Sequence, residues 1–298
     1  MKRTMHRDEV TVDETVVRRL LAEQFPEWAE LPLEAVEPRG TDNWLLRLGG
    51  ERVVRLPSRE RTVATLVRER TWLPRLTGRL PLEIPLPVAS AKPGAGYPWT
   101  WSVYRWLEGE NAIDALVADL ARAAVDLAAL LEALQRVDPN GGPGPGEENF
   151  YRGAPVVTFD PRVRADLAQL RDAIDVEAAT AVWDAALRAP GPEGPPVRVH
   201  GDLDRRNLLT RQGRLAAVVD FGCVGVGDPA CDVAVAWKVL SPETRNIFRS
   251  ALSVDQATWG RARGWAVSQA LGALAYYTPE TNPTLVAEAR RWLAEALA

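Results

Sequence analysis

The sequence predicts an α+β fold in two lobes, a small antiparallel sheet followed by a mainly helical region. Three observations lead to this prediction. Short runs rich in β-branched and aromatic residues, separated by turn residues, occupy the first third of the chain, and apolar residues then recur every three to four positions. The length of 298 residues is enough for two domains. We place the division at residue 105, which gives lobes of residues 1–105 and 106–298.

The first lobe is expected to contain two helices and four strands. Its first helix places apolar residues on one face and ends before Pro26, and the pair Gly49-Gly50 is typical of a hairpin turn. The helices are predicted at residues 13–25 and 59–76, and the strands at residues 33–37, 43–48, 52–56 and 100–106.

The second lobe is expected to be mainly helical, with short apolar runs and turns between residues 197 and 219. A long helix is predicted from Asp114, because apolar residues recur at helical spacing: Leu116, Leu120, Ala124, Leu127, Leu131 and Leu134. Two stretches rich in Pro and Gly, 139–149 and 189–196, are predicted to be exposed loops. Short apolar runs surround turns between residues 197 and 219, and from Pro229 the chain is predicted to be helical again.

The composition excludes several classes of protein. The longest stretch without a charged residue, 264–279, has sixteen residues and is too short and too polar to span a membrane. Residues 1–14 contain no apolar segment typical of a signal peptide, and two cysteines, Cys223 and Cys231, support neither a disulfide framework nor a zinc site. A net charge of −4 does not favour nucleic acid. We therefore expect a cytoplasmic protein without a membrane or nucleic-acid partner.

The most informative pattern is formed by four polar residues within 21 positions. His200, Asp202 and Asn207 occur as H-x-D-x-x-x-x-N, and Asp220 follows eighteen residues after Asp202, directly before Phe-Gly. Transfer of a phosphoryl group to a hydroxyl needs a carboxylate that orients the hydroxyl and accepts its proton, which fits Asp202. Mg²⁺ prefers oxygen ligands, which fits Asn207 and Asp220, and the apolar run 215–219 is the strand expected to return Asp220 to the loop. Each motif alone is a weak signal, but their order and spacing together predict a phosphotransferase.

Three segments resemble the aminoglycoside phosphotransferase family, kinase-like small-molecule kinases that include macrolide and choline kinases. They are HGDLDRRNLL at 200–209, VVDFG at 218–222 and GDPACDVAVAW at 227–237. The resemblance implies a protein-kinase-like fold with a nucleotide-binding lobe at 1–105 and a catalytic, substrate-binding lobe at 106–298. It also implies Asp202 as catalytic base, Asn207 and Asp220 as magnesium ligands, and His200 as a support for the loop.

Two further aspartates are expected to have supporting roles. Asp228 before Pro229 predicts the start of a helix, and Asp232 lies in the first turn of that helix, where a carboxylate suits the helix dipole. The resemblance implies that Asp232 accepts hydrogen bonds from the catalytic loop. The alternative is that Asp232 stabilises only its own helix, and we assign neither residue to catalysis.

The cation expected to hold the nucleotide phosphates is an arginine in this chain. Kinase-like folds use a strand lysine that pairs with a helix glutamate. The chain has three lysines, none of them on the third predicted strand: Lys2, Lys92 and Lys238. Arg55 occupies that place, and Glu69 in the next helix is its predicted partner, the alternative being an ordinary surface ion pair.

Further nucleotide contacts are predicted from weaker signals. The first hairpin lacks a GxGxxG motif and has Gly40-Thr41 in its place, so phosphate contacts there would use backbone N–H groups and the Thr41 hydroxyl. The resemblance places the adenine near Trp106, Leu107 and Glu108, through backbone hydrogen bonds. Trp106 as an ordinary core residue is the alternative.

The sequence therefore predicts an O-phosphotransferase that uses ATP or GTP and Mg²⁺ to phosphorylate a hydroxyl of a small molecule. The acceptor is expected to be an aminoglycoside-like antibiotic or another amino sugar or alcohol. Residues 106–298 hold 19 Lys and Arg against 26 Asp and Glu, which favours a polyamine, but Arg205 and Arg206 put two cations beside the catalytic loop. A kinase of a macrolide or unrelated metabolite, and a nucleotide-binding pseudokinase with a regulatory role, remain alternatives. A protein kinase is disfavoured, since no A-P-E motif follows Asp220, and no oligomeric state is predicted.

Overall fold

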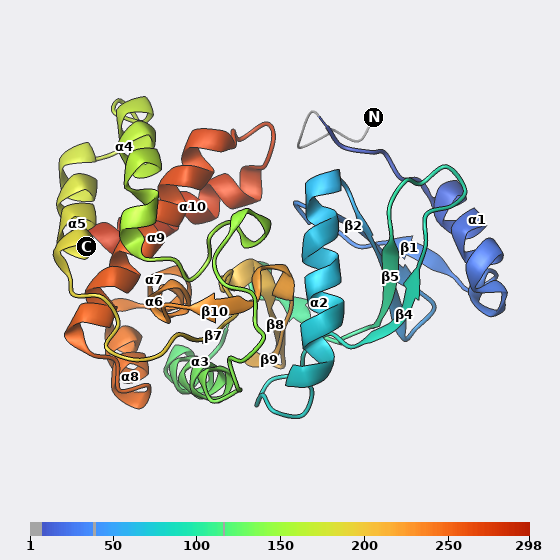
Figure 1. The fold of residues 1–298 in the computed structure, drawn as a ribbon, viewed down its shortest axis with the longest axis horizontal. Coiled ribbons are helices and arrows are strands. Elements are labelled where there is room, and N and C mark those ends of the chain that lie inside the picture. Colours follow the sequence, from blue (N-terminus) through green and yellow to red (C-terminus); the bar gives the residue numbers. More distant parts are fainter. Residues whose placement is uncertain (1–7, 38–39, 116) are drawn as a thin grey trace.

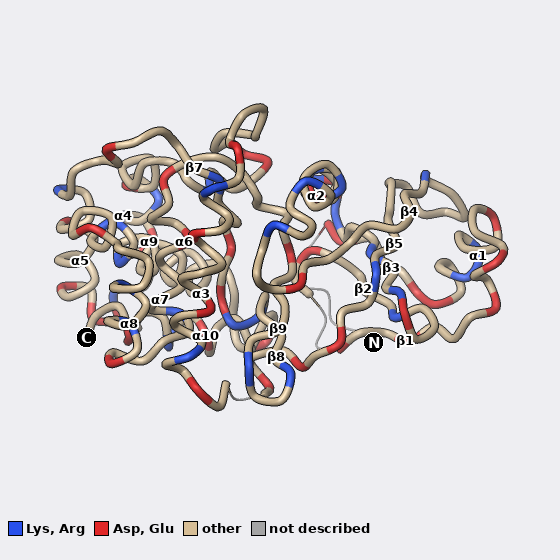
Figure 2. The backbone as a smooth tube through the Cα atoms, turned by 90° about the horizontal axis from the view of Figure 1, so that it is seen from below, with Lys and Arg blue, Asp and Glu red and all other residues tan. Residues whose placement is uncertain are grey.

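The computed structural model describes residues 8–37, 40–115 and 117–298, and it has the two-lobed α+β architecture predicted from the sequence. A five-stranded sheet with helix α1 lies at one end of the molecule and most of the helices lie at the other, with helix α2 between them (Figure 1). Acidic and basic residues are interspersed in both lobes (Figure 2). The division at residue 105 stays a prediction.

The elements have the following bounds. The helices are α1 (Glu14–Gln24), α2 (Val63–Leu76), α3 (Leu120–Gln135), α4 (Asp160–Gln169), α5 (Val176–Arg188), α6 (Ala230–Val233), α7 (Val235–Val239), α8 (Pro242–Ala251), α9 (Gln256–Tyr276) and α10 (Pro283–Leu297). The strands are β1 (Leu33–Ala35), β2 (Asn43–Leu48), β3 (Arg52–Pro57), β4 (Pro87–Ala91), β5 (Trp101–Arg105), β6 (Glu110–Asn111), β7 (Val197–Val199), β8 (Leu208–Arg211), β9 (Arg214–Val218) and β10 (Gly225–Gly227). Short 3₁₀ turns include η2 (Glu60–Thr62), η5 (Arg205–Asn207) and η6 (Phe221–Cys223).

The first sheet has the strand order β1-β2-β3-β5-β4, and every pair in it is antiparallel. Strand β4 was not expected, because its segment begins in a proline-rich run. Pro87 lies at the first position of this edge strand, and the pairing shifts register between Pro87 and Ala89. An edge strand tolerates a residue without an N–H group, so the proline does not prevent pairing.

Two apolar clusters stabilise the molecule. One lies between α1 and the five-stranded sheet and includes Leu20, Leu21 and Trp101, all fully buried. The other extends through the helices of the second lobe and also includes Leu66 and Trp72 of α2. Helix α2 therefore belongs to the first lobe by sequence but packs into the core of the second.

The long helix of the second lobe begins later than the sequence predicted. Helix α3 starts at Leu120, where Asp119 Oδ1 accepts a hydrogen bond from Arg122 N at 2.9 Å. Before it, strand β6 pairs with β8, and Asn111 Nδ2 donates to Arg206 O at 2.6 Å. These tertiary contacts displace the helical conformation that the apolar spacing favours, and Leu116 lies outside the described residues.

The predictions on membrane-spanning segments and on the cysteines can be compared with the described part of the chain. None of its helices combines the length and apolar character that crossing a membrane requires. Cys223 and Cys231 are buried free thiols. The N-terminal segment 1–14, for which no signal peptide was predicted, falls partly outside the described residues.

Candidate active site

The catalytic loop begins where β7 ends, and one buried carboxylate holds its first two residues. Asp232 Oδ2 accepts from His200 N at 2.6 Å, and Asp232 Oδ1 accepts from Gly201 N at 2.7 Å. Gly201 has φ +87, and a Cβ there would lie 2.8 Å from Cys223 O, so this turn requires glycine. Of the two readings of Asp232, the structure therefore supports contact with the loop.

His200 connects this loop to the segment that carries Asp220. Its Nε2 lies 3.1 Å from Val219 O, and its Nδ1 accepts from Asp202 N at 3.2 Å. Its ring packs against Phe221, with the two ring centroids 4.5 Å apart. The side chain is buried. His200 therefore holds both halves of the motif together and does not reach outward as a reactive group.

Asp202 is held on two sides. Arg152 Nη2 donates to Asp202 Oδ1 at 3.1 Å, and Asn207 Nδ2 donates to Asp202 O at 2.7 Å. Burial opposes ionisation, but the charges of Arg152, Arg206 and Lys238 lower the pKa of Asp202 to about 2. The carboxylate is therefore ionised at neutral pH and keeps a fixed direction.

The two predicted metal ligands lie on neighbouring backbone segments. Val219 N donates to Asn207 O at 2.9 Å, so the end of β9 returns beside the loop as predicted. Asn207 Nδ2 is used by Asp202, which leaves the amide oxygen of Asn207 without a hydrogen bond among the described residues. The Asp220 side chain is 44% exposed. Among the described residues, no group of three or more His, Cys, Asp and Glu side chains is arranged to hold a metal ion by itself.

Arg55 and Glu69 form a buried ion pair, with Arg55 Nη1 at 2.8 Å from Glu69 Oε2. The alternative of a surface pair is therefore wrong. Tyr104 Oη donates to Glu69 Oε2 at 3.2 Å, and burial raises the pKa of Glu69 to about 7 against the attraction of Arg55. Arg55 Nη2 also donates to Asp220 Oδ1 at 2.8 Å. One guanidinium thus connects strand β3, helix α2 and the predicted metal ligand.

The other residues predicted to contact the nucleotide are Thr41, Trp106 and Glu108. Thr41 lies half-buried in the turn before β2 and makes no side-chain hydrogen bond within the described residues. The Arg47 guanidinium lies 4.6 Å from the ring centroid of Trp106, and Arg47 Nη2 is 3.0 Å from Glu108 Oε1. Trp106 is only half-buried, and the backbone oxygen of Glu108 already accepts from Arg211 Nη2 at 2.9 Å.

Sequence reasoning missed two cations at the catalytic loop. Arg152 contacts Asp202 across 50 sequence positions, and Lys238 Nζ donates to Leu203 O at 3.1 Å. Burial lowers the pKa of Lys238 to about 8. Neither residue lies in a motif or near the loop in sequence, so no local pattern could have indicated it.

The two arginines inside the loop are neutralised by acidic neighbours. Arg206 Nη2 lies 2.6 Å from Asp204 Oδ2, and Arg205 Nη1 lies 3.3 Å from Glu288 Oε1. They are therefore weaker obstacles to a cationic acceptor than the sequence indicated.

The start of helix α6 is anchored by a second buried ion pair. Asp228 Oδ1 accepts from Ala230 N at 2.9 Å, which is the predicted helix-start role. Arg261 Nε lies 2.7 Å from Asp228 Oδ2, and both side chains are 3% exposed. This pair fixes the helix that carries Asp232.

A loop aspartate beside an asparagine, with a second aspartate returned by a hairpin, in a two-lobed fold of this kind, defines a kinase-like phosphotransferase. The sequence profile of the Phosphotransferase enzyme family matches residues 34–265, and the chain belongs to this family. This confirms the predicted resemblance and the prediction of a phosphotransferase. No curated protein is similar enough in sequence to count as a match.

Solved structures support the fold. The GDP and kanamycin complex of APH(2")-IIIa has a TM-score of 0.71 at 20% identity, covering 94% of this chain and 97% of that one. The ADP-bound aminoglycoside phosphotransferase APH(2'')-Ib has a TM-score of 0.61 at 17% identity, covering 96% and 99%. The macrolide 2'-phosphotransferase MphH of Brachybacterium faecium, as apoenzyme, has a TM-score of 0.61 at 21% identity, covering 93% and 98%. At these identities the likeness establishes the kinase-like fold.

Proposed function

We propose that this protein is an O-phosphotransferase that uses ATP or GTP with Mg²⁺ to phosphorylate a hydroxyl group of a small molecule. The observation that carries the proposal is the junction of Asp202, Asn207 and Asp220. Asn207 Nδ2 donates to Asp202 O at 2.7 Å, and Asn207 O accepts from Val219 N at 2.9 Å. Asn207 is thus hydrogen-bonded both to Asp202, the proposed base, and to Val219, the residue directly before Asp220.

Asp202 is the group that receives the acceptor hydroxyl. With a pKa near 2 it is a weak base, so its main contribution is to orient the hydroxyl and to take the proton late in the transfer. Arg152 and Asn207 restrict its rotation, which fixes the direction of attack. A carboxylate held in this way needs little reorganisation during the reaction.

Asn207 and Asp220 are the residues that would hold Mg²⁺, through an amide oxygen and an exposed carboxylate. The ion would supply charge neutralisation at the phosphates. Arg55 is the cation for the same phosphates. Since Arg55 Nη2 is 2.8 Å from Asp220 Oδ1, a phosphate must compete with that carboxylate for the guanidinium. Glu69 keeps the other side of Arg55 in place.

The nucleotide is proposed to lie between lobes 1–105 and 106–298, with Thr41 near the phosphates and Trp106 and Glu108 near the base. The similar solved structures include complexes with GDP, ATP and ADP, which supports a nucleotide ligand for this chain. Two of the similar structures are complexes with kanamycin and with gentamicin, and another is a macrolide 2'-phosphotransferase. These similarities support an aminoglycoside or macrolide acceptor and a role in antibiotic resistance. A cytoplasmic location stays a prediction.

The test is Mg²⁺-dependent consumption of ATP and of GTP across a panel of aminoglycosides, macrolides, amino alcohols and simple sugars. Asp202→Ala is expected to abolish acceptor-dependent turnover and to leave the nucleotide-induced rise in melting temperature largely intact. Asp172→Ala is the matched control, because this aspartate is 92% exposed and lies in a surface turn. Equal turnover in Asp202→Ala and the wild type would remove Asp202 from the mechanism.

The same experiment separates the enzyme from a pseudokinase. A pseudokinase would bind the nucleotide, with a rise in melting temperature, and would consume none with any acceptor. Loss of binding on chelating the metal, with Asn207→Ala and Asp220→Ala behaving alike, would support the proposed ligand pair.

A further inference from the structure

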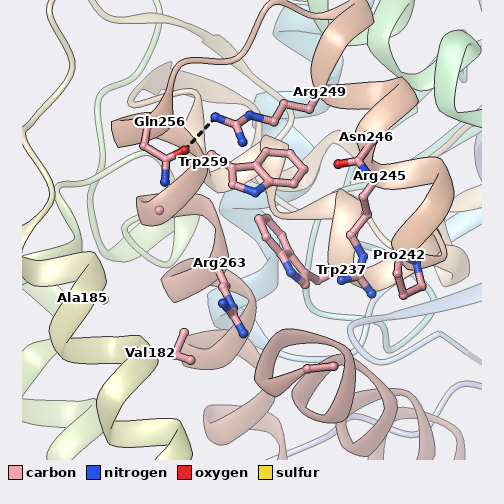
Figure 3. A pocket seen from close by; sticks show the side chains of 12 residues that line it. Val182, Ala185, Trp237, Pro242, Arg245, Asn246, Arg249, Gln256, Trp259 and Arg263 are labelled. Carbon is pink, nitrogen blue, oxygen red and sulfur yellow. Dashed lines mark hydrogen bonds between the residues drawn. The ribbon is translucent and has the colours of Figure 1, made fainter.

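A hollow of about 450 Å³ lies at the end of the molecule opposite the five-stranded sheet. Residues of helices α5, α7, α8 and α9, together with Ala298, line it. Figure 3 labels ten of these residues. None of the residues assigned above to phosphoryl transfer lines it. Its volume is within the range of small-molecule sites, roughly 300–1,000 Å³.

Three arginines surround this hollow, and two of them have no acidic partner. Arg245 pairs with Glu295. In the described chain, Arg249 and Arg263 form no ion pair with a carboxylate. Arg249 Nε donates to Val254 O, and Arg249 Nη2 donates to Gln256 Oε1, the hydrogen bond drawn in Figure 3. Arg263 Nε donates to Ala296 O at 2.6 Å.

Several guanidinium N–H groups are left for a ligand. The two terminal nitrogens of Arg263 make no hydrogen bond with the described residues, and neither does Arg249 Nη1. Arg245 Nε is buried and also has no partner. Arginine stays protonated, and Glu295 pairs with one of the three guanidinium groups, which leaves Arg249 and Arg263 without a paired carboxylate among the described residues. The backbone carboxylate of Ala298, which also lines the hollow, offsets part of this positive charge. An anion bound there would satisfy these donors.

Two tryptophans form an apolar wall next to these cations. The ring centroids of Trp237 and Trp259 are 4.5 Å apart with an angle of 44° between the rings. Trp237 is almost fully buried and Trp259 is half-buried. The Arg249 guanidinium lies 5.2 Å from the centroid of the Trp259 ring, so the exposed part of this indole lies next to that cation. Figure 3 shows both rings between the side chains of Arg249 and Arg263. Aromatic rings bind to such a surface by offset or edge contacts.

We propose that this hollow is a second ligand site, which binds a small aromatic compound carrying one carboxylate or phosphate group. The anionic group lies on the guanidinium groups of Arg263 and Arg249, and the ring packs on Trp259. The site is independent of the proposed phosphotransfer activity, since it shares no residue with it.

The test is isothermal titration of the wild-type protein with phenyl phosphate and with benzoate, which separate the two anionic groups. Cyclohexanecarboxylate keeps the charge and lacks the aromatic ring, benzyl alcohol keeps the ring and lacks the charge, and inorganic phosphate lacks a ring. Saturable binding of at least one aromatic anion, weaker binding of cyclohexanecarboxylate and none of benzyl alcohol are expected. No saturable binding of either aromatic anion would overturn the proposal.

Variants then locate the binding. Arg263→Gln and Arg249→Gln are each expected to weaken binding of the aromatic anion roughly tenfold, because each removes a charged hydrogen bond. Trp259→Leu should remove the preference for the aromatic anion over cyclohexanecarboxylate. Arg171→Gln, a 77% exposed arginine elsewhere, is the matched control and should bind as the wild type does. If binding is unchanged in both Arg263→Gln and Arg249→Gln, the anion binds elsewhere and the proposal fails.

Discussion

The two sides of the candidate active site are held by different kinds of contact. On the nucleotide side, Arg55 joins Glu69 and Asp220 through ion pairs between side chains. On the loop side, Asp232 accepts hydrogen bonds from the backbone of His200 and Gly201. A side-chain ion pair can exchange one partner for another, whereas two backbone amides can be satisfied only if the loop keeps its shape. The Arg55 side can therefore adapt to a ligand such as the proposed nucleotide, whereas the loop side is preorganised.

Asp232→Ala is expected to give the largest effect, because it breaks the preorganised side. The buried amides of His200 and Gly201 would lose their acceptor, at about 1–3 kcal/mol each. We expect a loss of stability of about 2–5 kcal/mol, and turnover at saturating nucleotide reduced at least about 100-fold, since the loop would no longer hold Asp202. Urea unfolding and steady-state kinetics check this. Asp232→Asn keeps one acceptor oxygen and should be intermediate; wild-type turnover in Asp232→Ala would contradict preorganisation.

Arg55 tests the adaptable side. Arg55→Met leaves Glu69 buried without a cation and removes the proposed phosphate contact, so nucleotide affinity should fall about 10–100-fold. Arg55→Lys keeps the charge but loses the forked geometry that reaches Glu69 and Asp220 together, and its affinity should stay within about tenfold of the wild type. Nucleotide titration and the KM for ATP measure both. Equal losses in the two variants would show that geometry, and not charge, is what position 55 supplies.

Lys238 gives a smaller, pH-dependent effect on the loop side. Burial lowers its pKa to about 8 from an ordinary value of 10.5. Between these values the unfolded chain binds a proton that the folded chain does not, so this lysine makes stability rise with pH in that window. Denaturant unfolding at pH 7.5 and pH 10 should show the wild type gaining up to about 3 kcal/mol relative to Lys238→Met. Parallel pH profiles for the two proteins would rule out a depressed pKa.

Glu108 should give the smallest effect. Its side chain is 66% exposed and pairs with Arg47, a surface ion pair worth at most about 1 kcal/mol. If the nucleotide base contacts only the backbone there, Glu108→Gln should change nucleotide affinity less than about twofold. Trp106→Leu, at the neighbouring position, should weaken nucleotide binding more. Titration of both variants would show whether the Glu108 side chain touches the nucleotide.

Much of the fold could be predicted because the responsible signals are local. The hairpin of β2 and β3 follows from Gly49-Gly50 and two short strand patterns, and α1 follows from its apolar face and from Pro26 after its end. Strand β10 was missed because two of its three residues are glycines, and its conformation depends on pairing with β7. Where tertiary pairing decides the backbone, as it does before α3, helical spacing alone gave the wrong start.

The part of the candidate site that could be predicted consists of residues that lie close together in the sequence. Asp202, Asn207 and Asp220 belong to one loop and hairpin, so their proximity follows from a short stretch of sequence. Arg55 and Glu69 could be paired from strand alternation and the helix that follows. The contact of Arg55 with Asp220 spans 165 positions, and that of Arg152 with Asp202 spans 50. Contacts of this kind arise from the packing of the lobes, which no local pattern reports.

Helix α2 links the position of Glu69 to the core of the second lobe. It carries Glu69, yet its residues Leu66, Trp72 and Leu73 are buried in the core of the other lobe. Moving this helix out of the second-lobe core would expose those side chains to water, at roughly 1.5–3 kcal/mol for each. A form in which helix α2 has left this core is therefore costly, so Glu69 keeps its place relative to the second lobe. A movement of the two lobes relative to each other would therefore carry Glu69 along with the second lobe, while Arg55 stays on strand β3.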